Sequence, residues 1–120
     1  MSGALLLATI AAFDLICVGT STQTKNGVEQ RPAPLESRLR IDLDADRWCG
    51  GPCDETAHFE KIEERKLTFF DQNIGSFVNT LTINRESGAY FFYRLSGRDA
   101  EIATAHCERA PFSGFPARKF

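Results

Sequence analysis

The stretch Phe77 to Leu95, FVNTLTINRESGAYFFYRL, constrains the fold more than any other part of this chain. Two apolar and aromatic runs flank a polar turn, which is the pattern of an antiparallel β-hairpin. Gly88 suits the left-handed position of that turn, because a residue without a Cβ adopts a positive φ at no steric cost. The spacing predicts a three-residue loop, Glu86 to Gly88, which is a common hairpin connection.

This loop predicts a pairing register in which Ile83 lies opposite Phe91. Side chains alternate between the two faces of a strand, so the register also decides which aromatic residues share a face. Tyr90 and Phe92 then lie on the less apolar face, where a second layer or a partner would cover them or a ligand would contact them. The opposite, core-facing set is predicted to be Phe77, Leu81, Ile83, Ala89, Phe91, Tyr93 and Leu95.

Turn signals recur every ten or so residues along the rest of the chain, which predicts an all-β fold. We expect an antiparallel meander of about seven to eight strands, forming a small barrel or a sandwich. The 120 residues suit a single domain, residues 13–120, with an irregular Pro- and Gly-containing tail at residues 109–120. The net charge of −2 gives no indication of nucleic acid or of an anionic membrane as a partner.

The strands outside the hairpin are predicted from alternation and turn residues. The segment 54–66 is ambiguous between a short helix and a strand, and we favour a strand from His58 to Ile62. Residues Asp71 to Ser76 are polar and contain Gly75, which predicts a turn. The other expected strands are Leu15 to Thr24, Arg38 to Leu43, Arg47 to Cys49, Leu67 to Phe70 and Ala100 to Glu108.

The N-terminal run ALLLATIAAF, Ala4 to Phe13, is apolar and ends in small residues. It is too short to span a bilayer as a helix and is typical of the apolar core of a secretory signal. We therefore expect residues 1–12 to be a signal peptide, with cleavage after Ala11 or Ala12. This predicts a periplasmic or secreted protein without a stable membrane span.

Four cysteines in a small exported domain predict two disulfides, for which three connectivities are possible. Cys49 and Cys53 flank the flexible Gly50-Gly51-Pro52 and pair easily, which leaves Cys17 with Cys107. A zinc site made from Cys49, Cys53 and His106-Cys107 is the alternative. In an exported protein the disulfides are favoured, and we expect no metal or other cofactor.

Several segments occur in a recognisable order: RIDLDADRWC at Arg40 to Cys49, then Cys53, INRESG at Ile83 to Gly88, Cys107-Glu108, and APFSGFPARKF at Ala110 to Phe120. In this order the chain resembles a group of small, exported, uncharacterised bacterial proteins. The resemblance covers most of the mature chain and implies a secreted β domain. No activity is known for the group, so no catalytic residue is transferred from it.

No catalytic motif stands out: the chain has no G-x-S-x-G and no phosphate-binding loop. The pattern favours an exported, non-catalytic binding or structural domain of the cell envelope, whose partner is a small apolar ligand or an envelope protein. Possible ligand-contacting aromatics are Tyr90, Phe92 and Trp48, although Trp48 beside Cys49 is also typical of a core residue. The alternative is a small envelope enzyme or a protease-inhibitor-like protein that uses the Cys49–Cys53 loop.

Overall fold

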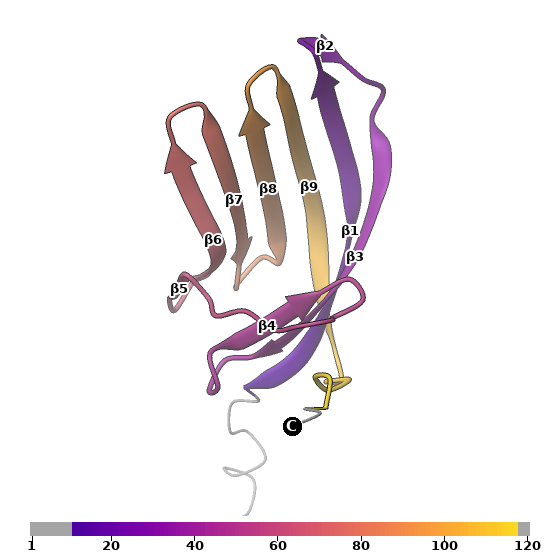
Figure 1. Ribbon diagram of the computed structural model, residues 1–120. Coiled ribbons are helices and arrows are strands. Elements are labelled where there is room, and N and C mark those ends of the chain that lie inside the picture. Colours follow the sequence, from indigo (N-terminus) through magenta and orange to yellow (C-terminus); the bar gives the residue numbers. More distant parts are fainter. Residues whose placement is uncertain (1–10, 118–120) are drawn as a thin grey trace, which may run out of the picture.

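The computed structural model describes residues 11–117 and shows an all-β domain, in which one antiparallel sheet is curled into a half-barrel (Figure 1). The predicted fold class is confirmed, and the sheet is an open half-barrel rather than a closed barrel or a sandwich. Most of the expected signal segment, residues 1–10, lies outside the described residues. The strands are β1 (Ala12–Lys25), β2 (Val28–Glu29), β3 (Ala33–Asp42), β4 (Arg47–Gly50), β5 (Lys61–Ile62), β6 (Lys66–Ile74), β7 (Phe77–Asn84), β8 (Ala89–Ser96) and β9 (Asp99–Ala110).

The sheet places its first and last strands side by side at its centre. The strand order is β4-β3-β1-β9-β8-β7-β6-β5, with β2 paired to β1, so β1 and β9 are neighbours. The short strands β4 and β5 are the two edges, and in the described part of the chain they do not pair with each other. One isolated bridge joins Trp48 of β4 to Ala57, through N–O distances of 2.9 and 2.8 Å. The half-barrel therefore stays open on that side.

The central hairpin forms, but its predicted register is wrong by one residue. Ile83 pairs with Tyr90, not with Phe91, and the loop has four residues, 85–88. The side chain of Asn84 causes the difference, because its Oδ1 accepts hydrogen bonds from the backbone N–H groups of Glu86 and Ser87, both at 2.9 Å. This side-chain-capped turn holds one residue more than the predicted loop.

The shifted register reverses the faces of β8. Tyr90 is buried in the core and Phe92 is half-buried against it, whereas Phe91 lies on the outer face with 43% of its surface exposed. Gly88 has the predicted positive φ, 77°. A Cβ there would lie 2.6 Å from the carbonyl oxygen of Cys107, so the close packing of this turn on β9 also requires glycine.

The core lies on the concave face and is aromatic near the two short edge strands. Trp48 of β4 packs edge-on against Phe69 at 5.0 Å between ring centroids and more loosely against Phe59 and Phe70. A register shift between Thr68 and Phe70 lets both Phe69 and Phe70 contact Trp48. The buried apolar residues of the core cluster are Phe13, Leu15, Cys17, Leu39, Ile41, Phe59, Leu67, Phe69, Leu81, Ile83, Tyr90, Ala103 and Cys107.

Three strand predictions need correction. The predicted turn from Asp71 to Ser76 is wrong, since β6 continues to Ile74 and only Gly75-Ser76 turn. The strand predicted from His58 to Ile62 is reduced to β5, and residues 54–66 contain no helix. Finally, β3 begins at Ala33, five residues before the predicted Arg38. Its early half pairs only with β1, so Pro34 lies on a free edge where a missing N–H costs little.

Candidate functional site

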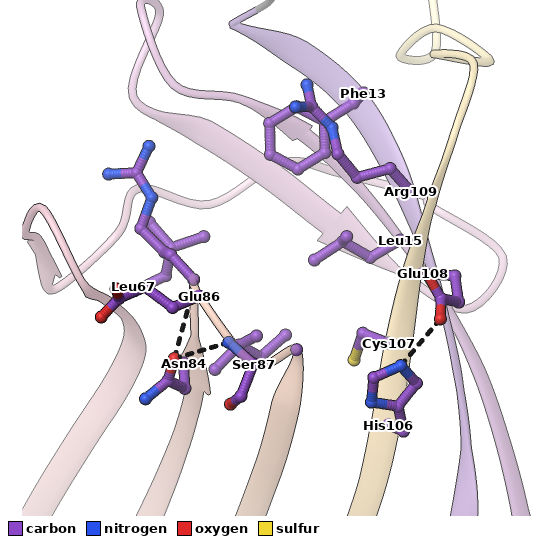
Figure 2. A pocket seen from close by; sticks show the side chains of 13 residues that line it. Phe13, Leu15, Leu67, Asn84, Glu86, Ser87, His106, Cys107, Glu108 and Arg109 are labelled. Carbon is purple, nitrogen blue, oxygen red and sulfur yellow. Dashed lines mark hydrogen bonds and ion pairs between the residues drawn. The ribbon is translucent and has the colours of Figure 1, made fainter.

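A pocket of about 350 Å³ opens where the β7–β8 turn meets β1 and β9 (Figure 2). Apolar and polar groups converge on it, as they do in small-molecule binding sites. The residues that line it are Phe13, Leu15, Leu67, Ile83, Asn84, Arg85, Glu86, Ser87, Gly88, His106, Cys107, Glu108 and Arg109.

The floor of this pocket is apolar and belongs to the protein core. Phe13 and Leu15 come from β1, Leu67 from β6 and Ile83 from β7, and all four are buried. Leu67 and Ile83 are directly paired across β6 and β7, so their side chains point to the same face. The floor is therefore the part of the protein core that borders the pocket.

The rim of the pocket is charged, and its charged groups already have protein partners. His106 Nε2 lies 2.7 Å from Glu108 Oε1, and Arg109 places its guanidinium 4.2 Å from the ring centroid of Phe13 (Figure 2). Arg85 donates from Nη1 to the carbonyl oxygen of Glu63 at 2.6 Å. Glu86 pairs with an arginine outside the pocket, Arg65, at 3.3 Å. A molecule in this pocket would thus have an apolar part inside and a polar part at the rim.

The aromatic residues predicted to contact a ligand do not line this pocket. Tyr90 is buried, and burial together with the negative charge of Glu101 raises the pKa of its phenol. Phe92 packs at 6.3 Å from Phe70, and Trp48 donates its indole N–H to the carbonyl oxygen of His58 at 3.2 Å. A ligand role for these three residues stays a prediction, while their observed contacts are those of core residues.

Both predicted disulfides are confirmed. Cys17 and Cys107 are directly opposite one another in β1 and β9, and they join positions 90 residues apart in the sequence. Cys49 and Cys53 close the turn that follows β4. No cysteine is free, and residues 11–117 contain no cluster of three acidic, histidine or cysteine side chains suited to a metal. The four cysteines thus provide cross-links rather than thiolate ligands.

A buried carboxylate that the sequence did not predict lies behind the pocket, on the outer face of β1. Asp14 is fully buried, and it accepts hydrogen bonds from Arg38 Nε at 2.7 Å and from the backbone N–H and the Oγ of Ser113 at 3.1 and 2.7 Å. Arg40 adds a hydrogen bond from Nη1 to the carbonyl oxygen of Gly114, at 2.9 Å. Together these contacts hold the C-terminal segment 111–117 against β1 and β3. The signal in the sequence was one acidic residue inside the apolar run FDLICV.

The pKa of Asp14 reflects two opposing effects. Burial by itself raises it, but the hydrogen bonds from Ser113 and Arg38 and the positive charge of Arg38 outweigh burial, so the pKa lies below its usual range. A carboxyl group with a lowered pKa in the folded state stabilises the protein above its unfolded pKa of about 3.9, and this contribution is lost as the pH falls through the folded pKa.

We therefore expect Asp14→Asn to lower the free energy of unfolding at pH 7 by roughly 1.5–3 kcal/mol, the range for hydrogen bonds to a charged group. The difference between the variant and the wild type should shrink at acidic pH, where Asp14 of the wild type is protonated. Urea denaturation at several pH values measures both quantities. Asp71→Asn changes an exposed carboxylate of β6 and serves as the control. A difference that stays constant from pH 7 to acid would contradict the assignment.

No helix long and apolar enough to cross a membrane is present within residues 11–117. Comparisons of the chain with models of known families, with curated proteins and with solved structures find no match.

Proposed function

We propose that this protein is an extracytoplasmic binding protein that holds the apolar part of a small amphipathic molecule in the pocket between the β7–β8 turn and β9. The observation that carries the proposal is the pocket itself, which is lined by the apolar residues Phe13, Leu15, Leu67 and Ile83 beneath a charged rim. Disulfides form and persist in oxidising compartments, so the two cross-links support a site of action outside the cytoplasm. We propose the periplasm or the extracellular space, in keeping with the resemblance to small exported bacterial proteins.

The contacts at the rim favour binding over catalysis. His106 and Glu108 form a hydrogen-bonded pair that resembles a general base with its orienting acid, but both side chains are mostly exposed, at 61% and 77%. A catalytic base must also reach a nucleophile. The serine of the rim, Ser87, instead accepts the backbone N–H of Ala89 at 3.2 Å. Within residues 11–117 the hydrogen bonds observed at the rim join His106 to Glu108 and Ser87 to the backbone of Ala89, and none joins His106 to Ser87.

The inhibitor alternative has less support. The Cys49–Cys53 loop exposes Gly51 and Pro52, while both of its cysteines are buried. Neither exposed residue has a long side chain that would fill the specificity pocket of a protease.

Partial filling of the pocket tests the proposal. The fluorescent anion 8-anilinonaphthalene-1-sulfonate reports on accessible apolar surface and is the probe. We expect the folded protein to bind it and decanoate to displace it. Ser87→Trp places a large side chain at the rim and should weaken dye binding by about tenfold, since the dye must displace an indole from the apolar floor. The measurement is a fluorescence titration of each variant.

Ser76→Trp, at the exposed β6–β7 turn, is the matched control, because it adds the same indole away from the pocket. Equal dye affinity in the two tryptophan variants, or dye binding that decanoate does not reduce, would count against the proposed site. Thermal denaturation of each variant shows that the fold is kept.

A further inference from the structure

One half of the sheet extends beyond the short strands β4 and β5 (Figure 1). The pairing registers place a row of polar side chains across the concave face of this half. The pairing registers place one polar residue of each of five neighbouring strands directly beside the next. From β1 to β6 the row consists of Gln23, Glu101, Arg94, Asn79 and Gln72. Neighbouring strands lie about 4.8 Å apart, so the row is on the order of 19 Å long.

This polar row is on the same face as the core. Cys17 of β1 and Cys107 of β9 point into the core, and the period of two along each strand places Gln23 and Glu101 on that face as well. No second layer from residues 11–117 covers this half of the sheet, because β4 and β5 pair only near its other end. The row therefore faces an open concave surface.

Aromatic rings border the polar row on both sides. On the core side lie Phe92 and Phe70, which are half-buried and in contact with each other at 6.3 Å. On the side of the strand tips lies Phe77, which is also half-buried and lines a cavity of about 460 Å³. Arg94 and Glu101 of the row line the same cavity. Hydrogen-bonding groups thus alternate with flat apolar surface along the direction of the strands.

The charges of this surface cancel. Arg94 Nη2 lies 3.7 Å from Glu101 Oε1, and the other oxygen of Glu101 accepts a hydrogen bond from Ser21 Oγ at 2.9 Å. The remaining members of the row are two glutamines and an asparagine, each of which both donates and accepts hydrogen bonds. Because the positive and negative charges cancel, this surface favours a neutral ligand over an anion or a cation. The amide side chains favour a ligand with many groups that both donate and accept hydrogen bonds.

We infer that this concave surface binds a neutral oligosaccharide. Sugar hydroxyls both donate and accept hydrogen bonds, so they match the amide groups of Gln23, Asn79 and Gln72. The C–H faces of sugar rings pack on aromatic side chains such as Phe77. An oligosaccharide is also elongated, as the row across five strands is. This site is at the far end of the sheet from the pocket at the β7–β8 turn, and the two share no lining residue.

An NMR titration of the ¹⁵N-labelled protein tests the inference. The probes are three neutral hexasaccharides, cellohexaose, maltohexaose and N-acetylated chitohexaose, and one anionic counterpart, oligogalacturonate. We expect at least one neutral probe at millimolar concentration to shift the amide resonances around Asn79, Arg94 and Glu101. The double variant Gln72→Ala with Asn79→Ala should bind that probe about tenfold more weakly, because several hydrogen bonds of the row are lost.

The matched control is Asp71→Ala with Thr80→Ala. These residues are the next pair along the same two strands, with side chains on the convex face, and their substitution should leave the affinity unchanged. The inference is overturned if no neutral probe shifts these resonances, if both double variants lose affinity equally, or if the anionic probe binds best. Ser87→Trp, which fills the pocket at the β7–β8 turn, should not alter sugar binding. If no sugar binds, the proposal for that pocket is therefore unaffected.

Discussion

Replacement of Cys17 and Cys107 together by serine is expected to lower the free energy of unfolding by roughly 4 kcal/mol. The bridge joins residues 90 apart in the sequence, so it removes much of the conformational entropy of the unfolded chain. It also joins the first and last strands, β1 and β9, at a pair of residues that lie directly opposite each other. Urea denaturation of the oxidised protein and of the variant, with the same probe of folding, measures the difference.

The second disulfide provides the comparison for this prediction. Cys49 and Cys53 are four residues apart, and cross-linking so short a loop is worth roughly 2 kcal/mol in the same model. Cys49→Ser with Cys53→Ser should therefore cost about half as much as the loss of the long bridge. An equal or larger loss from the short bridge would show that native contacts around it, and not the entropy of the unfolded chain, dominate.

The second large effect is expected from Gly19→Ala in β1. Gly19 pairs with Ala105 of β9, and a Cβ at Gly19 would overlap the carbonyl oxygen of Thr104 and lie 2.5 Å from the Cα of Ala105. Replacement of glycine by alanine inside a strand normally raises the free energy of unfolding by about 0.5–1 kcal/mol. Here we expect it to fall by about 3 kcal/mol, because β1 must move away from β9 to relieve the overlap.

Urea denaturation and an HSQC spectrum of Gly19→Ala test this expectation. Thr20→Ala, at the next and exposed position of β1, is the control and should change stability by less than about 1 kcal/mol. A Gly19→Ala protein as stable as the wild type would mean that β1 and β9 are not in such close contact.

Local patterns in the sequence determined the elements that depend on neighbouring residues. The turn at Gly88, the strands that alternate in polarity and the pairing of four cysteines all follow from residues close in the chain or from simple counting. In the same way, Leu39 and Ile41 alternate with charged residues in the predicted strand Arg38 to Leu43, and both are buried. The turn and the strands were predictable because their steric and hydrophobic causes act between residues close in the chain. The disulfides were predictable because four cysteines allow only three connectivities.

The register of the hairpin depends on a local contact that the turn pattern did not reveal. Asn84 lengthens the loop by one residue through hydrogen bonds to the backbone two and three residues further on, and so places Tyr90 in the core. Only the tertiary structure decided the features that depend on contacts between distant strands. Asp14 is buried as a carboxylate only because Arg38 and Ser113 reach it.

The pocket and the polar row share this dependence on distant strands. The segment Asp71 to Ser76 is predicted to be a turn because polar residues in an exposed strand cannot be told from polar residues in a turn by sequence, but β6 continues to Ile74. In the sheet, Gln72 of this segment is the last member of the concave row, because β6 extends beyond the core and has solvent on both faces. Register across strands sets which side chains share a face, and it is fixed by packing between segments far apart in the chain.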